Sequence, residues 1–191
     1  KMRVISVLLL VAVCAQAAKD IPFAYPLFKQ CDPAWGDDLM VTETICQVGC
    51  LMSSVSMALN GKGIKINGIS SNPGVLNTWL QQNGGYDADN DLYEEVIFEI
   101  APNDVAYLGP YYNNTSLSPQ TLKVMLLNEL VVIANVMNGG HFVLMTGFND
   151  DLTQWYVNDP GFDKDYYLYD DIVGYRVFVM ADVKDQFVIS K

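Results

Sequence analysis

The apolar residues of this chain change their spacing near residue 130, and this change restricts the folds that the chain can adopt. Before it, Leu51, Val55, Ala58 and Leu59 recur at helical spacing after Cys50. After it, runs rich in Val, Ile, Phe and Tyr are separated by turn-forming residues and predict strands at 131–136, 141–148, 154–158 and 175–180. Helices followed by an antiparallel sheet predict an α+β domain.

Other segments have clear boundary signals. A helix is expected at 73–82, with Asn72 as its cap and Pro73 at its first position. Another helix opens at Ser118-Pro119 and runs to Leu130. Residues 91–100 fit a short helix or a strand, 105–108 fit a short strand, and 18–48 read as an irregular lead-in.

The first residues have the pattern of a secretory signal. Basic residues precede an apolar run at 4–15, and Ala15-Gln16-Ala17 has the small-x-small form of a cleavage site. We therefore expect a signal peptide at 1–17, one domain at 18–191, and a location outside the cell or in the lumen of the secretory or lysosomal pathway. No later run is long enough for a membrane anchor.

The charge balance limits the partners. The chain has 11 Lys and Arg residues against 22 Asp and Glu residues, a formal net charge of −11. Because nucleic-acid binding requires basic surfaces, nucleic acid is not an expected partner. An acidic, solvated surface is the simpler interpretation, and a preference for cationic substrates is the alternative. The oligomeric state is left open.

The cysteines predict one free thiol. Cys14 lies in the signal segment, so Cys31, Cys46 and Cys50 form an odd set in an oxidising compartment. We favour a disulfide between Cys31 and Cys46, which leaves Cys50 free, and the other two pairings stay open. Asn113-Asn114-Thr115 and Asn114-Thr115-Ser116 are overlapping glycosylation acceptors, of which we expect one to be used at a time.

Cys50 stands where a helix is expected to begin. A helix N-terminus and a nearby imidazolium both favour a thiolate, and the N–H of Cys50 would face a developing oxyanion. Gly49 has no Cβ, which would let a substrate backbone come close. The alternative interpretation of Cys50 is a small buried apolar residue.

His141 is the only histidine of the chain, so a thiol hydrolase would have to use it as the base. It follows Gly139-Gly140 at the start of a strand, where its side chain would face a cleft. Asp159 ends the next strand, and a hairpin would return it toward His141 to orient the imidazole. A register shift of one residue would give this role to Asn158, and Asp-Pro-Gly is otherwise an ordinary turn.

Three segments together resemble the papain-superfamily cysteine peptidases of the bacteriocin-leader-processing type, family thirty-nine, and especially their secreted single-domain relatives. The resemblance covers nearly all of 18–191 and rests on Lys29-Gln30-Cys31-Asp32-Pro33-Ala34-Trp35-Gly36, Ile45-Cys46-Gln47-Val48-Gly49-Cys50 and Gly140-His141-Phe142-Val143-Leu144 with Asn158-Asp159-Pro160. It implies a papain-like fold, a peptide or protein substrate and no cofactor. It also implies that Cys50 is the nucleophile, His141 the base, Asp159 the orienting residue and Gln30 the oxyanion donor.

Other functions use the same side chains. Zinc binding by Cys46, Cys50, His141 and Asp159 is the competing chemistry, but a disulfide at Cys46 would remove one thiolate, so no metal is expected. A catalytically silent binding or structural protein and a peptidoglycan-peptide amidase are the alternative functions. Tyrosines and Trp155 in the strands suit a peptide or glycan groove, although packing is the expected role of most of them.

Overall fold

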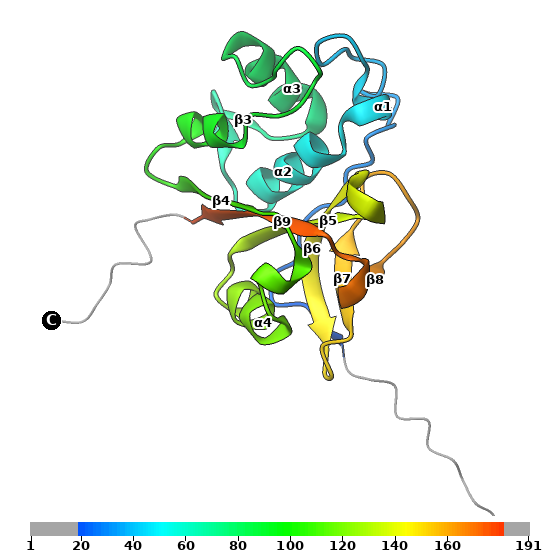
Figure 1. Cartoon of the computed structure of the whole chain (residues 1–191). Helices are drawn as coiled ribbons and strands as arrows, with labels where there is room; N and C mark the ends of the chain where they lie inside the picture. Colours follow the sequence, from blue (N-terminus) through cyan, green and yellow to red (C-terminus); the bar gives the residue numbers. More distant parts are fainter. Residues whose placement is uncertain (1–18, 182–191) are drawn as a thin grey trace, which may run out of the picture.

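A computed structural model describes residues 19–181 (Figure 1). The expected signal peptide at 1–17 lies outside the described residues, as do residues 182–191. An antiparallel sheet of seven strands has the order β4-β9-β5-β6-β7-β8, and β1 pairs with the far end of β6. Its strands are β1 Lys19–Asp20, β4 Val105–Tyr111, β5 Val131–Val136, β6 His141–Asn149, β7 Gln154–Asn158, β8 Tyr166–Leu168 and β9 Gly174–Met180.

Helices cover both faces of this sheet (Figure 1). The α-helices are α1 Ile45–Val48, α2 Cys50–Gly61, α3 Pro73–Gln82 and α4 Pro119–Leu127. Short 3-10 helices are η1 Glu94–Ile100, η2 Asn114–Ser116, η3 Met137–Gly139 and η4 Tyr169–Asp171, and a small hairpin is formed by β2 Lys65–Ile66 and β3 Ile69–Ser70. Within residues 19–181, none of the helices combines the length and the hydropathy needed to cross a bilayer.

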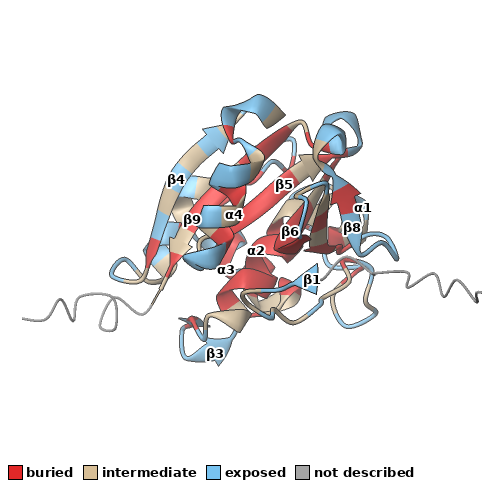
Figure 2. Ribbon diagram, turned by 90° about the horizontal axis from the view of Figure 1, so that it is seen from below, coloured by how far each residue is buried: buried red, intermediate tan, exposed pale blue. Residues whose placement is uncertain are grey.

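The sheet separates two hydrophobic cores because neighbouring residues of a strand point to opposite faces. Ile133 and Leu144 pack with the residues of α2 and α3, whereas Val132 and Val143 pack with Leu122 of α4 and its neighbours. The central strands and α2 are accordingly the most buried elements (Figure 2). The predicted α+β class with an antiparallel sheet is confirmed, and α4 lies on the face opposite α2.

Most predicted elements are present, with corrections at their ends. The helix expected to run to Leu130 ends at Leu127, because Asn128 caps it and Glu129 turns to a φ of 58°. The segment 91–100 resolves as the 3-10 helix η1, and the strand predicted at 105–108 continues to Tyr111. The short elements β1, α1, β8 and the hairpin of β2 and β3 were not predicted, since two to four residues carry too little periodicity.

The junction of α1 and α2 places Cys50 at the N-terminus of α2. Thr44 and Gln47 form a capping box that starts α1, and Gly49 then separates the two helices. A Cβ on Gly49 would lie 2.6 Å from the carbonyl oxygen of Ile45. Close packing against Ile45 therefore requires a glycine at this position, whereas the predicted approach of a substrate backbone stays a prediction. Cys50 becomes the first residue of α2.

Candidate active site

A cleft of about 470 Å³ opens where the start of α2 meets the start of β6. Gln30, Cys50 and His141 all line it, although they come from three separate segments of the chain. Its remaining wall mixes polar and apolar side chains and includes Met40, Met52, Leu51, Leu92, Phe142 and Phe162 together with Gln47, Asn90 and Asp91. Three of the four sequence-predicted catalytic residues thus border one cavity, and the fourth lies behind His141.

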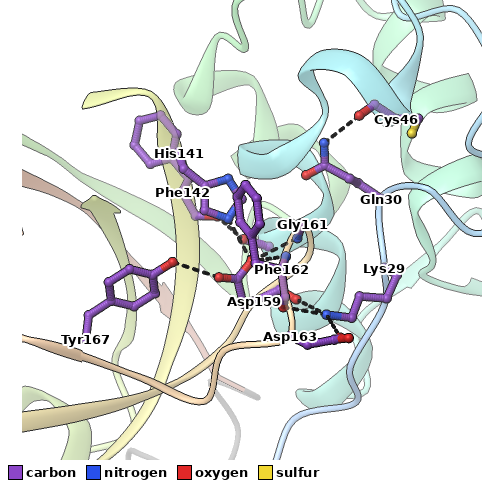
Figure 3. Close-up of polar contacts among 11 residues, drawn as sticks. Lys29, Gln30, Cys46, His141, Phe142, Asp159, Gly161, Phe162, Asp163 and Tyr167 are labelled. Atoms are coloured by element: carbon purple, nitrogen blue, oxygen red, sulfur yellow. Dashed lines mark hydrogen bonds and ion pairs between the residues drawn. The ribbon is translucent and has the colours of Figure 1, made fainter. Parts of the chain in front are cut away.

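Asp159 contacts the side of the His141 ring that faces away from the cleft. The β6-β7 hairpin pairs Leu144 with Asn158, which brings the next residue, Asp159, beside the first residue of β6. His141 Nε2 lies 2.7 Å from Asp159 Oδ1, and both side chains are almost completely buried (Figure 3). Because Nε2 is taken by the carboxylate, Nδ1 is the ring nitrogen left for Cys50.

Both members of this pair have shifted pKa values. Burial alone would lower the pKa of His141, but hydrogen bonds and charge from Asp159 and Cys50 outweigh it and raise the pKa to about 9. Burial alone would raise the pKa of Asp159, but hydrogen bonds from His141 and from the N–H groups of Phe162 and Gly161 lower it. The site therefore favours an imidazolium beside a carboxylate at neutral pH.

Gln30 lines the cleft, and a hydrogen bond fixes its side-chain amide. Its Nε2 donates a hydrogen bond of 2.8 Å to the carbonyl oxygen of Cys46, and its Oε1 is buried without a hydrogen-bond partner among the described residues (Figure 3). The backbone N–H of Gln30 donates to the carbonyl of Pro160, which ties the lead-in to the loop after β7. The Gln30 amide is thereby fixed at the wall of the cleft.

The disulfide pairs Cys31 with Cys46, and Cys50 is the free cysteine of the part that the structure describes. This is the pairing favoured from the sequence. The bond joins the residue after Gln30 to the residue whose carbonyl accepts from the Gln30 amide. It also removes Cys46 from the competing zinc site, and no group of three or more His, Cys, Asp or Glu side chains within 19–181 is arranged to hold a metal.

Residues 23–178 match the sequence model of the Peptidase_C39 like family. The chain belongs to this family. The match spans the lead-in with Gln30, the helix α2 that begins at Cys50 and the sheet from β4 into β9, so it includes every segment that borders the cleft. No curated protein matches the sequence. Membership in a Peptidase_C39 like family supports a hydrolase of the cysteine peptidase type.

Two residues that contribute to this Peptidase_C39 like site were not singled out as site residues by the sequence. Lys29 Nζ donates to the carbonyl oxygens of Asp159 and Phe162 and pairs with Asp163, which fastens the loop after β7 (Figure 3). The Tyr167 hydroxyl donates 2.9 Å to Asp159 Oδ2. From the sequence, Tyr167 belongs to a group of aromatic residues that suits a peptide or glycan groove and of which most are expected to pack. No local pattern distinguishes a tyrosine that donates to a distant carboxylate.

One alternative from the sequence is excluded by the fold. Asn158, the substitute orienting residue, donates its side-chain amide to the carbonyl oxygens of Tyr25 and Pro26. Its side chain therefore holds the lead-in against β7 and is not bonded to the imidazole. The register that the hairpin adopts gives the position beside His141 to Asp159.

Proposed function

We propose that this protein is a secreted cysteine hydrolase of papain-like fold that cleaves a peptide or amide bond through an acyl-thioester intermediate. The observation that carries the proposal is the buried 2.7 Å contact between His141 and Asp159 at the cleft that Cys50 lines. A thiol, an imidazole and an orienting carboxylate in this order are the parts of an activated nucleophile.

In the acylation step, the Cys50 thiolate attacks the carbonyl carbon of the scissile bond and forms a C–S bond. The carbonyl electrons move onto the oxygen, and the resulting oxyanion is stabilised by the N–H of Cys50 and the amide of Gln30. His141 then gives its Nδ1 proton to the leaving nitrogen as the C–N bond breaks. Asp159 keeps the ring oriented throughout.

In the deacylation step, His141 takes a proton from water, whose oxygen attacks the thioester carbon. The C–S bond breaks, the acid product leaves, and the thiolate and imidazolium are restored. The first turn of α2 supports both steps because the N–H groups of its first residues have no acceptor within the helix. The cleft needs no cofactor for this sequence of reactions.

Secretion and glycosylation are part of the same proposal. A disulfide close to the cleft suits an oxidising compartment. Asn113 is exposed, and its side chain accepts hydrogen bonds from Thr115 and Ser116, whereas Asn114 is half-buried. We therefore propose Asn113 as the glycan acceptor of the two, in a host that glycosylates.

Replacing Cys50 tests the nucleophile. Cys50→Ala should abolish turnover of a peptide library and covalent labelling by an electrophilic papain-type inhibitor, without lowering the melting temperature. Ser56→Ala is the matched control, because Ser56 is buried in the same helix and donates to the carbonyl of Ser53 away from the cleft. Full activity of Cys50→Ala would refute the mechanism.

The same experiment separates the alternatives. A silent binding or structural protein would leave Cys50 no more reactive toward the inhibitor than a free thiol in solution. A peptidoglycan-peptide amidase would be labelled at Cys50 and would release products from cell-wall peptides but none from protein substrates. Labelling together with protein cleavage supports the peptidase.

A further inference from the structure

Resting on the function proposed above, we propose that Tyr167 is a positioning residue of this site, whose hydroxyl binds Asp159 Oδ2 and keeps the carboxylate oriented toward His141. Tyr167 touches neither the cleft nor the nucleophile, so it acts through Asp159. It extends the series of thiol, imidazole and carboxylate by a fourth group, which lies on β8 at the edge of the sheet.

The two oxygens of the Asp159 carboxylate accept different numbers of hydrogen bonds. Oδ1 accepts from His141 Nε2 at 2.7 Å and from the N–H groups of Gly161 and Phe162, each at 2.9 Å. Among the described residues, Oδ2 accepts from the Tyr167 hydroxyl at 2.9 Å and from no other donor. The carboxylate is fully buried, so water does not replace a missing donor at the surface.

Tyr167 reaches this oxygen from the neighbouring strand. Trp155 pairs with Tyr167 across β7 and β8, and Asp159 directly follows the end of β7. Tyr167 is 3% exposed, and burial together with the hydrogen bond to Asp159 raises its pKa. The phenol therefore stays protonated and remains a donor over the working pH range.

The neighbouring charges do not supply a substitute. Lys29 binds the backbone carbonyl of Asp159 and pairs with Asp163, while Lys164 lies over the Tyr167 ring at 3.8 Å from its centroid. Asp171 adds negative charge near the phenol. On the cleft side, Cys50 faces His141. Removing the phenol hydroxyl would leave a buried carboxylate oxygen without a partner, so the carboxylate would be held through Oδ1 alone.

The consequence follows through His141. A carboxylate held through one oxygen only is less firmly oriented toward the ring, so it stabilises the imidazolium less and His141 would lose its proton at a lower pH. The imidazolium that assists Cys50 would then be rarer at neutral pH. Tyr167→Phe should reduce the rate of Cys50 alkylation by iodoacetamide at neutral pH by roughly threefold to tenfold, since hydrogen bonds to charged groups are the strong ones.

This chain allows both quantities to be measured without knowing the substrate. His141 is the only histidine, so its ring proton signal in an NMR titration reports the His141 pKa directly. Cys50 is the free cysteine within 19–181, so alkylation followed by mass spectrometry reports its reactivity. We expect the midpoint of His141 to move to lower pH in Tyr167→Phe, and the melting temperature to fall by roughly 2–10 °C while the protein stays folded, because a buried acceptor loses its donor.

Tyr175→Phe is the matched control, because Tyr175 is also a buried strand tyrosine whose hydroxyl donates to a backbone carbonyl, that of Asn114. It should leave the His141 midpoint and the alkylation rate unchanged. An unshifted His141 midpoint in folded Tyr167→Phe would overturn the inference while leaving the nucleophile in place. Full activity in Cys50→Ala would instead overturn the proposed function on which the inference rests.

Discussion

Gly161 offers the sharpest test of the site geometry, because it lies directly against the imidazole. It follows Asp159 by two residues, and its N–H donates 2.9 Å to Asp159 Oδ1. A Cβ at this position would lie 2.9 Å from Cε1 of His141 and 3.4 Å from Gln30 Oε1. Gly161→Ala would therefore place a methyl group between the proposed base and the proposed oxyanion donor.

These distances set how much Gly161→Ala should lower the stability and the reactivity of the site. Carbon atoms in contact prefer separations of about 3.5–4.0 Å, so the ring or the loop must move by roughly half an ångström or more. Overpacking of this kind costs about 1–3 kcal/mol of stability. A displacement of about 1 Å at a reacting group costs roughly a hundredfold in rate. We expect inactivation by an electrophilic peptide inhibitor to slow by tenfold to a hundredfold, on the same scale.

The assay compares the second-order rate constant of inactivation at Cys50 with the melting temperature of the same protein. Gly140→Ala is the graded comparison: its added Cβ meets only the carbonyl oxygen of Met137, at 3.4 Å. That variant should stay within about threefold of the natural protein, because such a contact is ordinary. Natural reactivity in folded Gly161→Ala would refute the placement of His141 between Asp159 and the cleft.

Two further predictions concern pH and the disulfide. Because the pKa of His141 is raised to about 9, the imidazolium is present below that pH, and activity should be lost as the pH rises through about 9. Asp159→Asn should move this alkaline limb of the pH–rate profile to lower pH. An alkaline limb that stays in place would contradict the role of Asp159. Cys31→Ser with Cys46→Ser should lower the unfolding free energy by about 3 kcal/mol, as expected for a bridge across 15 residues. Urea denaturation measures this loss, and unchanged stability would show that packing alone holds the lead-in.

Local patterns were sufficient for much of the fold. The helix at 73–82 and the strands at 131–136 and 154–158 have the predicted ends, because caps, turns and apolar spacing act over a few neighbouring residues. The end of α4 was missed, since the left-handed turn at Glu129 follows no strong sequence signal. The packing role of Gly49 is not predictable from the sequence, because it depends on how closely the backbone of Ile45 in the preceding turn approaches.

The sequence supplies the chemical groups of the site: a free thiol after an odd cysteine count, one imidazole, and a carboxylate at the end of a hairpin strand. Folding sets how these groups are used. It buried Asp159 against His141, fixed the Gln30 amide on Cys46, and gave the second carboxylate oxygen to Tyr167. These contacts join residues far apart in the chain, and their strength depends on burial, which no local pattern of residues encodes.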